Sequence, residues 1–224
     1  MFFCEAIAVQ IAVARDADVD APSRAFFRYR LSALGVSQSP EAVPLLVLIG
    51  DHAAPPPTVG EVFDALRVRA YHPLLVLTMQ VGGETMSTAV EEKARSTIVR
   101  VRATHDVDPA RIYLVGEARG ADLVWRLIEF SGDDYAAAVA ANMRAGGAAD
   151  PSRLDRLAGV PFWIFHDAAD ERVPVAVVRA TVGALWAAGA NVRYTEYRDD
   201  DPGRWAALRR EDRLLTWLFM QSRE

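Results

Sequence analysis

A turn framed by two glycines is the feature of this sequence that bears most directly on chemistry. An apolar run ends at Gly116, and Gly120 closes the turn four residues later. In the pattern Gly-x-Ser-x-Gly, a sharp strand-to-helix turn exposes a serine hydroxyl that attacks acyl carbonyls. Here Ala118 occupies the serine position, and its methyl group has no atom that could attack. The spacing therefore predicts the turn of an acyl-transfer enzyme without its nucleophile.

The segments that must position this turn alternate between strand and helix patterns. Short apolar runs typical of strands buried on both faces occupy residues 44–49, 74–78, 112–115 and 162–165. Strands nearer the sheet edge are predicted at 25–32, in an antiparallel hairpin with 4–13, and at 192–197. Helical periodicity covers residues 58–69, 87–104, 118–130, 174–188 and 205–221. This alternation predicts an α/β fold with a mostly parallel sheet.

Composition limits the class of protein. The 224 residues are 51% hydrophobic and 25% charged, which is enough for one folded domain over residues 1–224. A net charge of −5 argues against nucleic-acid binding. Cys4 is the only cysteine, so no internal disulfide can form. No apolar run approaches the roughly 20 residues that span a bilayer, and the first residues carry Glu5 without a cationic stretch. We expect a soluble, cytoplasmic protein without membrane contact.

Three stretches carry a family resemblance. They are residues 108–116 (DPARIYLVG), residues 161–175 (PFWIFHDAADERVPV), and residues 191–197 (NVRYTEY) followed by Trp205 and residues 214–219 (LLTWLF). Together they resemble the esterase branch of the α/β-hydrolase superfamily, which includes feruloyl esterases and polyhydroxybutyrate depolymerase-like proteins. The resemblance implies the α/β-hydrolase fold, with a mostly parallel central sheet flanked by helices on both faces. Residues 142–158, which precede the second of these stretches, are too few for a large lid domain.

The resemblance also assigns the catalytic positions. The acid of the family, the last residue of its Phe-His-Gly-Ala-x-Asp motif, is retained as Asp170. The nucleophile position is Ala118, and the histidine position, three residues before Trp205, is Pro202. The oxyanion loop, His-Gly-x-Gly in the family, reads GDHA at residues 50–53, so its glycines are displaced. We therefore expect no serine-hydrolase activity.

Several residues are candidates for lining a pocket. Glu117 and Arg119 flank the turn, and Asp51 and His52 stand in the former oxyanion loop. Arg119 begins a helix, so its backbone N–H and side chain could bind a carboxylate or a phosphate. For each residue a structural role is the alternative: ion pairing for Glu117 and Arg119, and solvent exposure for His52.

Other polar residues also admit two interpretations. Met79 and Gln80 end the fourth strand, where family members line the pocket mouth, although core packing would explain Met79 equally well. Asp170 is either an orphaned catalytic acid or the cap of the helix that starts near Pro174. His166 matches a structural histidine of the family. The acidic run 199–201 is typical of a solvated turn, and no metal site and no cofactor are predicted.

Two functions fit these observations. The first is a pseudoenzyme that binds a small molecule or acts as a regulatory partner, as a homodimer or beside an active relative. The second is a repurposed cyclase, lyase, isomerase or decarboxylase of a small-molecule pathway. This second function would use a pocket carboxylate as a general base.

Overall fold

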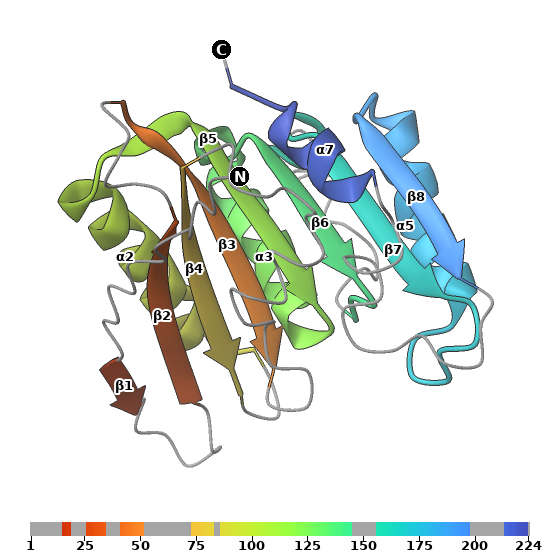
Figure 1. The fold of residues 1–224 in the computed structure, drawn as a ribbon. Coiled ribbons are helices and arrows are strands. Elements are labelled where there is room, and N and C mark those ends of the chain that lie inside the picture. Colours follow the sequence, from red (N-terminus) through yellow and green to blue (C-terminus); the bar gives the residue numbers. More distant parts are fainter. Residues whose placement is uncertain are drawn as a thin grey trace, which may run out of the picture.

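One sheet organises the part of the chain that the computed structural model describes, namely residues 15–18, 26–34, 41–51, 73–82, 86–144, 156–197 and 213–223. Its eight described strands run in the order β1-β2-β4-β3-β5-β6-β7-β8 (Figure 1). Their bounds are β1 Arg15–Asp18, β2 Phe26–Leu34, β3 Val43–Asp51, β4 Leu74–Val81, β5 Val107–Glu117, β6 Ala137–Ala141, β7 Phe162–Asp167 and β8 Val192–Tyr197. The pairs β1–β2 and β2–β4 are antiparallel, and all the other pairs are parallel.

Helices cover both faces of this sheet. Figure 1 shows α2 (Thr88–Thr104), α3 (Arg119–Ser131) and α5 (Val175–Ala187) behind the strands and α7 (Leu214–Phe219) in front. A short 3₁₀ turn, Gly132–Asp134, follows α3. The predicted α/β class, the mostly parallel sheet and the helices on both faces are confirmed. No helix in the described part of the chain combines the length and the apolarity that crossing a bilayer requires.

The core lies in two layers because neighbouring strand residues point to opposite faces. In β3, Leu45, Val47 and Ile49 pack with α2, α3 and α5, whereas Leu46 and Leu48 pack with α7. All five side chains are fully buried. The continuous apolar run at 44–49 is therefore explained by burial on both faces, as its sequence predicts.

Most of the predicted elements lie where the sequence places them. The strand predicted at 192–197 has those bounds, and α2 begins after Ser87, whose hydroxyl accepts a hydrogen bond from the N–H of Val90 at 3.4 Å. The helix predicted at 174–188 spans Val175–Ala187, and Gly189, where φ is 78°, follows its C-cap. Strand 112–115 is longer than predicted and begins at Val107. The strand predicted at 4–13, the helix at 58–69 and the start of the helix at 205–221 lie outside the described residues.

The sixth strand is built almost wholly from alanine. Residues 137–141 read Ala-Ala-Val-Ala-Ala, and all five are buried between β5 and β7. Alanine favours helices over strands, so local propensity does not delimit this strand. Its neighbours on both sides supply the pairing that fixes it.

Candidate functional site

The β5–α3 turn has the backbone of a nucleophile elbow. Ala118 links the two elements with φ 52° and ψ −115°, a conformation that L-residues rarely adopt. Its N–H donates a hydrogen bond to the carbonyl of Ala141, the last residue of β6, at 2.9 Å. The half-buried methyl group of Ala118 therefore stands at the tip of the turn, where the pattern Gly-x-Ser-x-Gly would hold a hydroxyl.

The two glycines of the turn are required by close backbone contacts. A Cβ on Gly116 would overlap the carbonyl of Gly120, and a Cβ on Gly120 would overlap the carbonyl oxygen of Ile49 in β3. Any side chain at either position would push α3 away from the sheet. The strand, the turn and the helix are therefore packed as closely as in a nucleophile elbow, although the turn carries alanine in place of serine.

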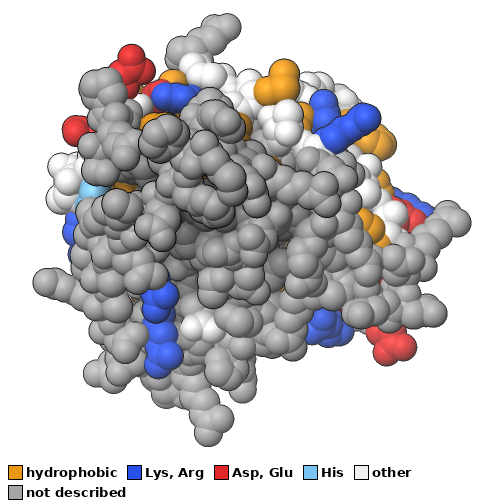
Figure 2. Space-filling view, viewed as in Figure 1, with side chains coloured by type: hydrophobic (Ala, Val, Ile, Leu, Met, Phe, Trp, Pro, Cys, Tyr) orange, Lys and Arg blue, Asp and Glu red, His pale blue; other side chains and the backbone are white. Residues whose placement is uncertain are grey.

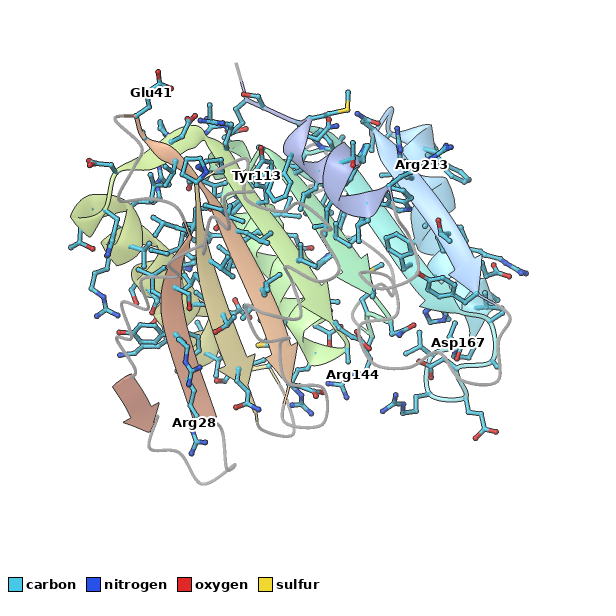
Figure 3. The ribbon with its side chains drawn as sticks, viewed as in Figure 1. Arg28, Glu41, Tyr113, Arg144, Asp167 and Arg213 are labelled. Atoms are coloured by element: carbon cyan, nitrogen blue, oxygen red, sulfur yellow. The ribbon has the colours of Figure 1, made fainter. Side chains whose placement is uncertain are left out.

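The carboxyl ends of β5, β6 and β7 bring polar residues to one edge of the sheet. Asn142 directly follows β6 with φ 51°, and its Oδ1 accepts a hydrogen bond from the N–H of Asp167 at 3.1 Å. Figure 3 shows Arg144 and Asp167 at this edge, whereas Tyr113 and Arg213 lie at the opposite edge. Ligands of open α/β sheets bind at the carboxyl ends of the strands.

Asp170 lies in the loop after β7 and organises that loop. Its Oδ1 accepts hydrogen bonds from the backbone N–H groups of Arg172 at 2.8 Å and of Val173 at 3.2 Å. The Arg172 side chain adds a 3.8 Å ion pair, although 79% of that side chain is exposed. This role is structural, but it is not the predicted cap of the helix, because α5 begins after Pro174 and has no side-chain cap.

His166, near the end of β7, contacts the same loop. Its side chain is fully buried, and Nε2 lies 3.0 Å from the carbonyl oxygen of Val173. If Nε2 carries the proton, it donates to that carbonyl and leaves Nδ1 as an acceptor. Nδ1 is buried without a hydrogen-bond partner. The predicted structural role of His166 agrees with this burial.

A cavity of about 350 Å³ opens beside the Asp170 loop. It is lined by Asn142, Asp167, Asp170, Glu171 and Arg172. The cavity is thus bounded by three carboxylates, an amide and a guanidinium. Within the described residues, no group of three or more His, Cys, Asp or Glu side chains converges on one point as metal ligands do.

Two arginines lie next to the Ala118 turn. Arg144 donates hydrogen bonds to Asp122 in α3 from its backbone N–H, at 2.6 Å to Oδ1, and from Nε, at 3.4 Å to Oδ2. Arg119 is half-buried, and its Nη1 is buried without a hydrogen-bond partner. Burial and the nearby charge of Arg144 lower the pKa of Arg119, although Asp51 and Asp122 act in the opposite direction.

The remaining pocket candidates are distributed around the same edge. Glu117, the last residue of β5, is buried, and Asp51 ends β3 half-buried. Gln80 donates a long hydrogen bond of 3.5 Å from Nε2 to the carbonyl of Asp51. Met79 is fully buried in the core layer that contains α2, α3 and α5, as the core-packing alternative expects. His52 and Pro202 lie outside the described residues.

The sequence pattern does not single out six residues of this edge, namely Asp122, Asn142, Arg144, Asp167, Glu171 and Arg172. A usable signal exists for Asp167, because it closely follows the apolar run at 162–165. Asn142 follows β6, whose alanines do not mark a strand in the sequence. The pairing of Asp122 with Arg144 joins residues 22 positions apart, and no local pattern marks it.

Solved structures resemble this fold over nearly the whole chain. A thermostable esterase matches 95% of the chain with a TM-score of 0.76 and 26% identity, and the chain spans 63% of that protein's length. Est1E from Butyrivibrio proteoclasticus matches 92% of the chain, and 99% of its own, with a TM-score of 0.65 and 14% identity. A ferulic acid esterase matches 93% of the chain, and 98% of its own, with a TM-score of 0.67 and 14% identity. No family model and no curated protein matches the chain.

Proposed function

Because the chain has the α/β-hydrolase fold, we propose that it is a non-hydrolytic member of that superfamily. In this role it binds a small molecule at the carboxyl edge of the sheet, or it serves as a partner or regulatory subunit. Its structural neighbours include esterases, and a feruloyl-type ester is the substrate class that their names suggest for an active relative.

Ala118 carries this proposal. It occupies the tip of a turn whose backbone still has the strained angles of a nucleophile elbow, but its methyl group cannot attack a carbonyl. In a subtilisin-type enzyme, loss of the serine or of the histidine alone lowers kcat on the order of a million-fold. An oxyanion hole by itself leaves only about 10³–10⁴ over water.

The surroundings of Asp170 support the same function. Its Oδ1 already accepts two backbone N–H groups, so the carboxylate has a structural task that needs no histidine. The two histidines in the described part of the chain do not offer an imidazole to it: the His105 ring contacts the hydroxyl of Thr104, and the His166 ring contacts the carbonyl of Val173.

Hydrolysis of 4-nitrophenyl butyrate by the wild type and by Ala118→Ser tests the proposal. We expect both proteins to match the buffer rate, because the serine variant still lacks the histidine that the family places at Pro202. The control is Asp170→Asn. Wild-type turnover that Asp170→Asn abolishes would contradict the proposal, since it would show a working acid in a hydrolytic site.

The alternative, a repurposed non-hydrolytic enzyme, is favoured by the carboxylates of the cavity. Asp167, Asp170 and Glu171 all line it, and a carboxylate is a suitable general base for elimination or isomerisation. A thermal-shift screen with hydroxy acids, lactones and acyl esters, followed by NMR of each stabilising compound, separates the two functions. Conversion of a compound supports the enzyme. If no compound raises the Tm and another protein chain co-purifies, the partner function is supported instead.

A further inference from the structure

We propose that the cavity beside the Asp170 loop binds the ammonium group of a small molecule through the side-chain carboxylates of Asp167 and Asp170. This inference rests on the proposed function and specifies the ligand class of the binding site at the carboxyl edge of the sheet. The ligand would be a primary amine, which is protonated and therefore cationic at neutral pH.

Both carboxylates line the same cavity and are largely buried. Asp167 is the last residue of β7 and is 6% exposed, and the side chain of Asp170, in the loop that follows, is 9% exposed. Figure 3 shows Asp167 at the edge of the sheet where this loop begins. Oδ1 of Asn142 accepts a hydrogen bond from the N–H of Asp167 and so fixes the backbone at this point. Carboxylates are seldom buried to this degree unless a partner compensates their charge.

Each carboxylate uses one oxygen for the loop and leaves the other without a partner. Oδ1 of Asp167 accepts a hydrogen bond from the N–H of Ala169 at 2.9 Å, and Oδ1 of Asp170 accepts the N–H groups of Arg172 and Val173. In the described part of the chain, neither Oδ2 atom has a hydrogen-bond partner, and neither is sealed from solvent. Two acceptors that belong to charged groups are thus available to a donor in the cavity.

The charges around the cavity favour a cation. Its lining includes the carboxylates of Asp167, Asp170 and Glu171 but only one cationic group, the guanidinium of Arg172. Arg172 compensates little of this negative charge, because its Nε lies 3.8 Å from Oδ1 of Asp170 and 79% of its side chain is exposed. A cation held between the two buried carboxylates would be attracted more strongly than one on the open surface.

An ammonium group fits this lining better than a metal ion does. Ca²⁺ takes six to eight oxygen ligands, whereas no three His, Cys, Asp or Glu side chains of the described residues converge as metal ligands do. A primary ammonium has three N–H donors and can use the two Oδ2 atoms of Asp167 and Asp170. Hydrogen bonds between an ammonium and a carboxylate are about twice as strong as those between neutral groups.

Calorimetric titration at neutral pH and constant ionic strength tests the site with four probes: hexylammonium, hexyltrimethylammonium, hexan-1-ol and Ca²⁺. We expect hexylammonium to bind at least about tenfold more tightly than hexan-1-ol, which lacks the charge. It should also bind more tightly than hexyltrimethylammonium, which keeps the charge but has no N–H to donate. Ca²⁺ should bind more weakly than hexylammonium, because the cavity offers it too few oxygens.

Two conservative variants remove the unpartnered oxygens. Asp167→Asn and Asp170→Asn each keep an oxygen for the loop N–H groups and replace the other by an NH₂ group. Each should weaken hexylammonium binding about tenfold. Arg172→Gln should instead tighten it about twofold, because it removes the competing cation. Circular dichroism establishes that each variant is folded.

Asp133→Asn is the matched control, because it removes the same charge from an exposed residue of the turn after α3. It should leave hexylammonium binding unchanged. The ammonium site would be overturned if hexan-1-ol or hexyltrimethylammonium bound as tightly as hexylammonium, if Ca²⁺ bound more tightly, if both asparagine variants bound normally, or if no probe bound. Hexan-1-ol binding without a preference for the amine would still leave the small-molecule function standing, whereas ester turnover would reject that function without touching the ammonium site.

Discussion

The N-terminus of α3 rests directly on β3, because Gly120 packs its backbone against the carbonyl group of Ile49. The two residues belong to neighbouring segments of the site, one at the start of the helix and one near the carboxyl end of a central strand. Their contact fixes how far Ala118 projects beyond the sheet. Glycine is the only residue that allows this approach.

Gly120→Ala should therefore destabilise the protein severely. The added methyl group would overlap backbone atoms that cannot move without displacing α3, so we expect a loss of about 3 kcal/mol or failure to fold. Gly183→Ala is the control, because a methyl group there meets nothing within 4 Å and lies within α5. It should stabilise the protein by about 0.5–1 kcal/mol, as measured by urea unfolding. Equal effects of the two substitutions would contradict the close contact.

Ala118→Gly should stabilise the protein. At φ 52° and ψ −115°, alanine holds a conformation that costs of order 1–3 kcal/mol, and glycine adopts it more readily. Glycine also loses more backbone entropy on folding, which offsets part of the gain. We expect a net increase of about 1 kcal/mol in the free energy of unfolding. A decrease would indicate that the alanine methyl group makes packing contacts that outweigh the strain.

Asp122 should prove structurally important although it lies at the site. Asp122→Ala removes the acceptor of both Arg144 hydrogen bonds and should cost about 2–3 kcal/mol in urea unfolding. Asp122→Asn keeps an oxygen for the backbone N–H of Arg144 and should cost about half as much. Glu91→Gln breaks a surface pair with Arg126 and serves as the control, with an expected change of at most about 1 kcal/mol. An Asp122→Ala effect no larger than this control would show that the pairing adds little.

Variants of Asp170 show whether its hydrogen bonds or its negative charge stabilise the loop before α5. Asp170→Asn retains an acceptor for the two backbone N–H groups, so we expect a change within about 0.5 kcal/mol. Asp170→Ala removes the acceptor of both loop N–H groups and should cost about 1–2 kcal/mol in thermal unfolding. If the asparagine and alanine variants lose equal stability, the charge of Asp170 and not its hydrogen bonds stabilises the loop.

The free energy of unfolding should fall at high pH because Tyr113 ionises less readily in the folded protein than in the unfolded chain. Burial raises the pKa of Tyr113 to about 12, because the folded protein disfavours the tyrosinate. The unfolded chain releases this proton near pH 10, so the stabilisation is complete below pH 10 and decreases as the pH rises towards 12. Tyr113→Phe lacks this titration, but it loses a 2.8 Å hydrogen bond to the carbonyl of Gln221, worth about 1 kcal/mol.

Urea unfolding at pH 8 and pH 11 measures the effect. The wild type should exceed Tyr113→Phe by about 1 kcal/mol at pH 8, and this advantage should shrink at pH 11. Tyr135 and Tyr194, whose pKa values are also raised by burial to about 12, remain in both proteins and cancel in the difference. If the difference between the two proteins does not change with pH, Tyr113 is not the group that lowers stability at high pH.

The sequence predicted much of the fold because the central strands are buried on both faces. Their uninterrupted apolar runs, such as residues 44–49 and 162–165, have few alternative interpretations. The alanines of β6 are the opposite case, since only pairing with β5 and β7 makes them a strand. Figure 2 shows charged side chains of both signs around the rim of one face, and scattered surface charges of this kind form no sequence pattern that marks an element.

Fewer features of the candidate site than of the fold could be predicted from the sequence. The glycine spacing located Ala118 and its neighbour Arg119, because a turn is a local feature. The engagement of Asp122 by Arg144 depends on how β6 and α3 pack, which short-range patterns do not report. For the same reason the sequence left open whether Asp170 is an orphaned catalytic acid or a helix cap, whereas the structure shows it bonded to the backbone of Arg172 and Val173 in the loop before α5.

The hydrogen bond between Tyr113 and Gln221 has a consequence for biosynthesis. It joins residues 108 positions apart, and Arg223 adds a bond from its backbone N–H to the carbonyl of Ala110 at 3.0 Å. The strand that leads into the Ala118 turn therefore gains its last partners only after residue 223 has left the ribosome. Until then the face that α7 covers is exposed on the nascent chain, and contacts of such long range form slowly. Chaperone demand during translation should consequently concentrate on this face.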